Sequence, residues 1–201
     1  MTYMSVRYFR PFDNFFSDNL LRREWHLMRY ILLSEPAGYI MLGELTAQDM
    51  TMITVEIADP FSSESQRLIE TLSAELAAIT GDNGKSNFNV EAMNNANALW
   101  VLAKNSHGEA IGCGAIRPLT QNIAELKRMF SDRSVPGIGG ALLAFLETSA
   151  KERGYSELRL ETRHINHRAV NFYEKHGYRR IENYGPYTGR PEAACFSKVL
   201  R

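Results

Sequence analysis

The stretch that decides the fold runs from Glu125-Leu-Lys-Arg-Met-Phe130 through a short loop to Pro136-Gly-Ile-Gly-Gly-Ala-Leu-Leu143. Residues 123–130 alternate between apolar and polar side chains, which is the pattern of a β-strand. In residues 137–153 the leucines recur at helical spacing, and Gly154 follows as a helix-ending residue. The sequence therefore predicts a strand, a loop over residues 131–136 and a helix.

The start of that helix is a place where a bulky anion can bind. The first N–H groups of a helix have no partner within it, and the peptide dipoles add partial positive charge there. Glycines at positions 137, 139 and 140 place no side chain in the way. Pro136 suits the first turn because its φ is fixed and it has no N–H to leave unpaired. A tight turn with glycines for packing explains the same residues equally well.

Two common nucleotide-binding motifs fit this loop poorly. A P-loop places a lysine after its last glycine, whereas Ala141 follows Gly140 here. A dinucleotide-binding turn needs a third glycine where Leu142 stands, and a much shorter connection from the strand. The sequence therefore argues against a nucleoside triphosphate and against a dinucleotide.

The rest of the chain predicts a mixed α/β domain over residues 52–201, in which helices flank both faces of a central, mostly antiparallel sheet. The expected strands are Met52–Ala58, Ala98–Lys104, Ala110–Ile116, Ile123–Phe130, Leu158–Thr162, Tyr178–Tyr184 and Ala194–Val199, and the expected helices are Ser65–Ile79, Val90–Asn95, Gly137–Arg153 and Arg168–His176. Residues 1–51 follow no such order, although residues 20–33 have helical spacing. We interpret them as an accessory extension or as an upstream segment included by the choice of start codon.

Composition limits the partners and the compartment. The chain has 23 lysines and arginines against 23 aspartates and glutamates, so no net field attracts nucleic acid or membrane. Cys113 and Cys195 are too few for a disulfide framework and are expected to be reduced. Neither a long apolar run nor a secretory signal is found. We expect a cytoplasmic protein, and the exposed edges of such a sheet allow pairing into a homodimer.

Over Met52 to Leu200 the chain resembles the GNAT superfamily of acyl-CoA-dependent N-acetyltransferases. Besides the strand and glycine loop, the resemblance rests on Asn166-His-Arg-Ala-Val-Asn-Phe-Tyr-Glu-Lys-His-Gly-Tyr178, which is similar to the family's Asn-x-x-Ala-x-x-x-Tyr-Glu-x-x-Gly-Phe. It implies transfer of an acetyl group from acetyl-CoA to a primary amine of a small, amino-acid-like molecule. The alternatives are a protein N-terminus or lysine as acceptor, or a non-catalytic module that binds acyl-CoA.

The resemblance also implies which residues bind acetyl-CoA. The pantetheine arm would follow the strand end, the pyrophosphate would meet the glycine loop, and one asparagine would contact the arm from the next helix. These residues are Met129, Phe130 and Ser131, then Gly137, Ile138, Gly139, Gly140 and Ala141, and finally Asn166. One position departs from the family, because Ser134 stands where an arginine or glutamine is usual and Arg133 lies one place earlier.

Two side chains are the candidates for acid and base. Tyr173 matches the family's tyrosine, which implies a general acid that protonates the leaving thiolate, although its spacing also suits a core residue. Glu125 shares a strand face with Lys127 and could take the amine proton, with Glu161 as the fallback. A solvated charge at a strand end explains Glu125 nearly as well.

The remaining polar residues carry weaker hypotheses. Arginines at strand ends can hold a substrate carboxylate and two tyrosines near Gly185 can line the acceptor pocket, but surface exposure and turn packing explain them too. These residues are Arg117, Arg128, Arg163, Tyr184 and Tyr187. The histidines at 164, 167 and 176 lack the helical pairing of a metal site, so no metal is expected.

Overall fold

The computed structural model describes residues 6–7, 53–84, 88, 90, 93 and 95–201. The helix predicted within residues 20–33 and most of the one predicted at 90–95 lie outside the described residues. The described elements are β1 (Val6–Arg7), β2 (Thr54–Ile57), α2 (Ser63–Thr80), β3 (Leu99–Lys104), β4 (Ala110–Pro118), β5 (Ile123–Ser131), α3 (Ile138–Glu152), β6 (Glu157–Arg163), α4 (His167–Lys175), β7 (Arg179–Arg180), the 3-10 turn η4 (Gly185–Tyr187) and β8 (Ala193–Val199).

The strands form one sheet in the order β1-β2-β3-β4-β5-β6-β8-β7. Every neighbouring pair is antiparallel except β5 and β6, which are parallel because α3 connects them. The predicted fold class, a mixed and mostly antiparallel sheet with helices on both faces, is confirmed. The last hairpin differs from the prediction, since β7 ends at Arg180 and not at Tyr184. Ile181 still donates its N–H to the carbonyl of Cys195, and the chain then turns through η4, where Tyr187 packs against Cys195 in a small separate cluster.

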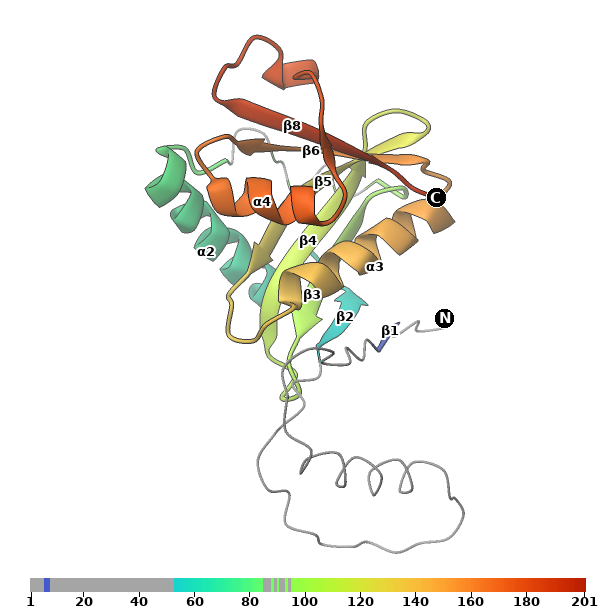
Figure 1. The fold of residues 1–201 in the computed structure, drawn as a ribbon. Coiled ribbons are helices and arrows are strands. Elements are labelled where there is room, and N and C mark those ends of the chain that lie inside the picture. Colours follow the sequence, from blue (N-terminus) through green and yellow to red (C-terminus); the bar gives the residue numbers. More distant parts are fainter. Residues whose placement is uncertain (1–5, 8–52, 85–87, 89, 91–92, 94) are drawn as a thin grey trace, which may run out of the picture. The chain divides into compact units, whose positions relative to one another are not determined.

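Residues on the two sides of β3, β4 and β5 supply two hydrophobic cores, one on each face of the sheet. Leu99, Val101 and Ala103 of β3 belong to the core under α3, together with Tyr173 of α4. The residues between them, such as Trp100, pack with Leu68, Ile69 and Leu72 of α2 on the opposite face. Helices α3 and α4 therefore share one face, in front of the sheet in Figure 1, and α2 covers the other.

A glycine in β4 lets the start of α3 lie close to the sheet. A Cβ atom at Gly112 would lie 2.7 Å from Cγ2 of Ile138 and 2.8 Å from the carbonyl oxygen of Phe130. Neither neighbour can move easily, because the first is a buried residue of α3 and the second is backbone of β5. The small residue thus fixes the first turn of α3 beside the end of β5.

The pairing of β5 with β6 covers only part of both strands. Ile123, Ala124 and Glu125 are in register with Glu157, Leu158 and Arg159, and the two strands separate beyond that point. In Figure 1 the strands β6 and β8 turn away from the direction of β3, β4 and β5. One side of the second half of β5, residues 126–131, is therefore without a strand partner among the described residues.

Two further sequence expectations concern bulk properties. Both cysteines are buried and neither is in a disulfide. Within the described ranges, none of the helices combines the length and the apolar character that crossing a membrane requires.

Candidate active site

A cleft of about 290 Å³ opens where β5 and β6 separate. It is lined by the second half of β5, the end of β6, the first turns of α4, the start of α3 at Gly139, and the last turns of α2 on the opposite face of the sheet. Of the predicted site residues, those that line it are Met129, Phe130, Ser131, Gly139, Asn166 and Tyr173. The cleft therefore brings together the end of β5, Gly139 of the glycine loop and the Asn166–Tyr178 block, while Gly137, Ile138, Gly140 and Ala141 are not among its lining residues.

A β-bulge shapes the wall that β5 gives to this cleft. Cys113 of β4 is opposite Phe130 and Ala115 is opposite Lys127, so β5 holds one residue more than β4 between these pairs. Arg128, at the bulge, has a φ of 51°, and its carbonyl oxygen lies 3.4 Å from Sγ of Cys113. Because a trans peptide directs its C=O and the following N–H to opposite sides, the N–H of Met129 points away from Cys113.

The start of α3 presents free backbone donors. Gly137 precedes the helix with a φ of 97°, which an L-residue rarely adopts, and no side chain caps the first turn. The N–H of Ala141 donates to the carbonyl of Gly137 at 2.9 Å, so the free donors are those before Ala141. Gly139 also serves packing, because a Cβ there would lie 3.2 Å from the ring of Phe172. Both interpretations of the glycine loop, anion binding and close packing, are thus compatible with the structure.

Two residues of the Asn166–Tyr178 block have defined positions on the cleft. Asn166 caps α4, since its Oδ1 accepts a hydrogen bond from the N–H of Ala169 at 3.2 Å. The Tyr173 ring is 7% exposed and packs edge-on against Phe172 and Tyr178. Tyr173 lines the cleft, and none of the described residues is hydrogen-bonded to its hydroxyl. Burial raises the pKa of this phenol, so it stays protonated at neutral pH.

Glu125 lies at the last paired position of β5 and β6, directly before the two strands separate. We call this position the closed end of the split between the strands. The Glu125 carboxylate forms ion pairs with Arg117 Nη2 at 2.7 Å and Lys127 Nζ at 3.1 Å. It also accepts hydrogen bonds from the hydroxyl groups of Tyr184 and Tyr187, at 2.9 and 3.3 Å. Burial raises the pKa of Glu125, but the charges of Lys127 and Arg117 outweigh it and the net shift is downward. A carboxylate with these partners is a weak base, and it is not among the residues that line the cleft. The base role of Glu125 stays a prediction, which these contacts do not favour.

Glu161 has the opposite properties. It lies on β6 and lines the cleft, and within the described chain its carboxylate is in no hydrogen bond or ion pair. Burial raises its pKa above the ordinary glutamate value, and the attraction of Lys127 and Arg163 offsets only part of that effect. A half-buried carboxylate with a raised pKa can accept a proton in the cleft.

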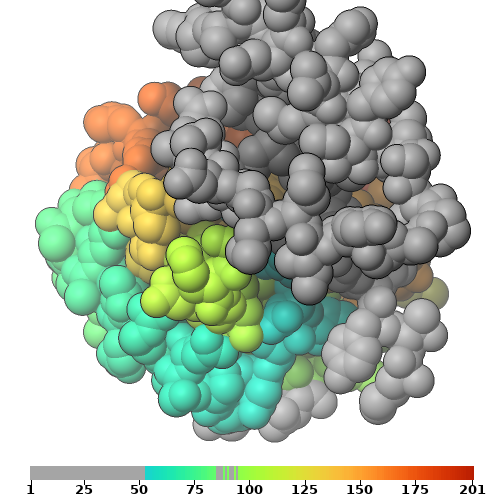
Figure 2. Space-filling model, turned by 90° about the horizontal axis from the view of Figure 1, so that it is seen from below, coloured from blue at the N-terminus to red at the C-terminus, as the bar shows by residue number. Residues whose placement is uncertain are grey.

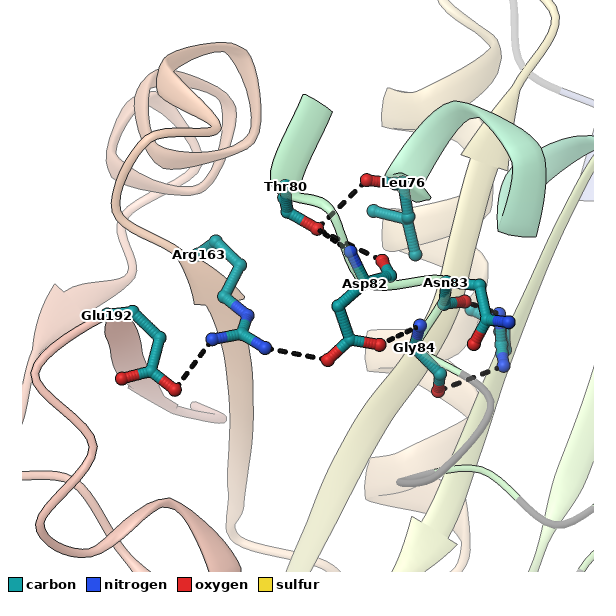
Figure 3. Close-up of polar contacts among 8 residues, drawn as sticks. Leu76, Thr80, Asp82, Asn83, Gly84, Arg163 and Glu192 are labelled. Carbon is teal, nitrogen blue, oxygen red and sulfur yellow. Dashed lines mark hydrogen bonds and ion pairs between the residues drawn. The ribbon is translucent and has the colours of Figure 1, made fainter. Parts of the chain in front are cut away.

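Two arginines that the sequence offered as substrate ligands hold the connection after α2 instead. Arg128 is 8% exposed and donates to the carbonyl of Gly84 at 3.1 Å and to Ser73 Oγ at 3.1 Å. Arg163 contacts Asp82 and Glu192, each at 2.7 Å (Figure 3). The N–H of Gly84 and then Arg163 keep the pKa of Asp82 low, so this carboxylate stays charged.

These contacts place residues 82–84 as a bridge between the two separated strands, because Arg128 belongs to β5 and Arg163 to β6. Sequence reasoning did not find the bridge. Asp82 and Arg163 are 81 positions apart, and no local pattern connects them.

The described histidines do not form a group of metal ligands. His176 directs Nδ1 to the carbonyl of Phe172 at 2.7 Å and stacks near that ring. In the described part of the chain, no group of three or more histidine, cysteine or carboxylate side chains has the arrangement of a metal site.

Comparison with known proteins identifies the family. The family model described as Acetyltransferase (GNAT) family matches residues 64–178, more than half of the 201 residues, and the chain belongs to this family. It is an N-acetyltransferase of this family.

Curated relatives carry related names. The IAA acetyltransferase of Azospirillum brasilense is 29% identical over 154 residues, which are 75% of this chain and 100% of that protein. The uncharacterized N-acetyltransferase YjgM of Escherichia coli (strain K12) is 32% identical over 109 residues, covering 52% of this chain and 63% of that one.

Solved structures share the fold. A protein from Klebsiella pneumoniae, provisionally assigned as an acyl-CoA N-acyltransferase, is 28% identical with a TM-score of 0.63, over 74% of this chain and 98% of that chain. A GNAT family acetyltransferase from Elizabethkingia anophelis, solved with acetyl-CoA bound, is 20% identical with a TM-score of 0.54, over 74% and 98% of the two chains.

The contacts of Glu125 predict a loss of stability in Glu125→Gln. Removing this carboxylate leaves Lys127 and Arg117 without their buried counterion, which costs about 3 kcal/mol of unfolding free energy at neutral pH. The pKa of Glu125 is lower in the folded state than in the unfolded state. The difference in unfolding free energy between the variant and the wild type is therefore largest at pH values above the unfolded pKa, and it disappears as the pH falls through the folded pKa.

Urea unfolding at several pH values measures this difference. The exposed Glu109→Gln, which removes the same charge, should change stability by no more than about 0.5 kcal/mol. An equal effect of the two substitutions would contradict the structural role of Glu125.

Proposed function

We propose that this chain transfers the acetyl group of acetyl-CoA to the primary amine of a small molecule. The observation that carries the proposal is the cleft between β5 and β6, which is lined by the second half of β5, including Met129, and by Gly139 in the first turn of α3. An extended ligand with amide groups can add to the free side of β5 as a further strand would. Its phosphates can then meet the start of α3.

The residues present fit coenzyme A in this position. Met129, Phe130 and Ser131 would hold the pantetheine arm, and Ile138, Gly139 and Gly140 would supply N–H donors for the pyrophosphate. When bound, acetyl-CoA supplies the activated acetyl group as a thioester. The N–H of Met129 is oriented to stabilise negative charge that develops on the thioester carbonyl oxygen.

Tyr173 is the proposed donor to the leaving sulfur. Tyr173 lines the cleft, and its hydroxyl has no competing hydrogen-bond partner among the described residues. The raised pKa keeps the O–H intact across the working pH range, but it also makes full proton transfer to a thiolate unfavourable, since thiols ordinarily titrate near 8.5. We therefore assign Tyr173 a hydrogen bond to the sulfur as its charge grows.

Glu161 is the proposed base, in place of Glu125. The amine must lose a proton to attack, and Glu161 is a cleft carboxylate whose raised pKa suits it to accept one, directly or through water. On the α2 side of the cleft, Leu72, Leu76 and Ile79 form an apolar wall. A small amine with an apolar body fits this wall, and its ammonium form is attracted by Glu161.

The proposed hydrogen bond from Tyr173 to the sulfur is tested with Tyr173→Phe. We expect kcat to fall by about 10- to 100-fold, because the hydrogen bond to sulfur forms only as charge develops, while the Kd for CoA changes by less than about twofold because the ring packing is kept. Thiol release from acetyl-CoA is followed with a panel of small amines, amino acids and a lysine-containing peptide.

Tyr178→Phe is the matched control, since Tyr178 belongs to the same aromatic cluster but does not line the cleft. Equal rates in both variants would remove Tyr173 from the mechanism. Binding of acetyl-CoA without acetylation of any acceptor would contradict the proposed transfer to a small amine, and transfer to the peptide alone would indicate a protein acceptor.

The base assignment predicts a change in the pH profile of kcat/KM. The raised pKa of Glu161 places the acidic fall in rate at a higher pH than an ordinary glutamate would, because the protonated carboxyl cannot accept a proton. In Glu161→Gln the rate drops by about 100-fold and the acidic limb due to this group disappears. Glu157→Gln, on the same strand and face but outside the cleft, keeps the wild-type profile. An unchanged profile in Glu161→Gln would show that another group is the base.

A further inference from the structure

Two arginines at the rim of the cleft share one carboxylate. Arg133 Nη1 lies 2.8 and 3.1 Å from the two carboxylate oxygens of Glu75, and Arg168 Nη2 contacts the first of these oxygens. The arginine side chains are 53% and 57% exposed and that of Glu75 is 24% exposed. All three residues line the cleft. The carboxylate is therefore the more enclosed member, with a guanidinium on either side.

The three residues come from separate elements. Glu75 is on α2, Arg133 is in the connection from β5 to α3, and Arg168 is in the first turn of α4. Figure 2 shows these segments side by side at one edge of the view from below, with the end of α2 in green, the β5–α3 connection in gold and α4 in orange. Through Glu75, helix α2 on one face of the sheet is thus connected to the β5–α3 connection and to α4 on the other face.

The connection itself directs Arg133 to this place. Ser134 donates its N–H and its hydroxyl to the carboxylate of Asp132, at 2.9 and 2.7 Å, so its side chain is used within the loop. Arg133 has a φ of 66°, in the left-handed region that non-glycine residues rarely adopt. Ser134 is thus hydrogen-bonded within the loop, whereas Arg133 lines the cleft.

The chemistry of the cluster matches a phosphate as well as a carboxylate. Guanidinium groups bind either anion through paired N–H donors, and two of them in one place repel each other unless an anion lies between. Half-exposed ion pairs of this kind contribute little each. A ligand with several negative charges can therefore displace Glu75 from both arginines.

We propose that Glu75 is an internal anion that occupies the arginine pair in the empty chain, and that a phosphate group of coenzyme A exchanges with it on binding. This inference rests on the proposed binding of coenzyme A in the cleft. On binding, the phosphate replaces the Glu75 carboxylate at Arg133 and Arg168. Helix α2 then loses its ion pairs with these two arginines. Since α2 also carries the apolar wall on the acceptor side, the exchange links the two halves of the cleft.

The test compares the Kd for coenzyme A in wild type, Glu75→Gln and Glu152→Gln by isothermal titration calorimetry at low ionic strength. Without the competing charge, Glu75→Gln should bind coenzyme A about three- to tenfold more tightly. Glu152, an exposed residue at the end of α3, is the control of equal charge and should leave the Kd unchanged. Pantetheine, which has no phosphate, should bind all three proteins alike.

Two further arms identify the partner groups. In an Arg168→Gln background the gain from Glu75→Gln should shrink, because the two residues act on one contact. Dephospho-CoA locates the phosphate: a gain that persists assigns the exchange to the pyrophosphate, and a gain that is lost assigns it to the ribose phosphate. A Glu75→Gln variant that unfolds at the wild-type temperature but binds coenzyme A equally or more weakly would overturn the exchange. Failure of the wild type to bind coenzyme A would instead overturn the proposed function.

Discussion

The parallel pairing of β5 with β6 ends at Glu125 and Arg159, and the site depends on that ending. Beyond it, no described strand pairs with the backbone donors and acceptors on one side of β5, so they are available to solvent or a ligand. The bulge at Arg128 then orients the N–H of Met129 away from β4. A continuous sheet would have paired these groups with β6 and left no space between the two core-packed faces.

Buried charge holds the two strands in this arrangement. At the closed end, Glu125 joins Arg117 and Lys127 to the tyrosines of the last hairpin. At the α2 side of the open end, Arg128 and Arg163 draw residues 82–84 across the split. Such groups add less to stability than their number implies, because each loses its hydration on burial. Their contribution is geometric, since they fix where two diverging strands stop and what lies between them.

Local patterns were sufficient for most of the described helices and strands, whereas the site residues were inferred from the resemblance to a family and stay a prediction. The helix expected at residues 137–153 is found at Ile138–Glu152, because its apolar spacing and terminal glycines are properties of the segment itself. The side-chain roles were harder to predict. Alternation placed Glu125 on the same strand face as Lys127. It could not show that four side chains contact the Glu125 carboxylate. Nor could it show that Glu161, and not Glu125, lines the cleft. Those contacts join distant segments and exist only after the chain has folded.

Amide hydrogen exchange with and without coenzyme A tests, at residue resolution, whether coenzyme A binds along the unpaired side of β5. Such binding should slow exchange at Met129 and at Ile138, Gly139 and Gly140, with no change along β3, which is already paired on both sides. Saturating binding that leaves these amides unchanged and protects another segment would contradict it.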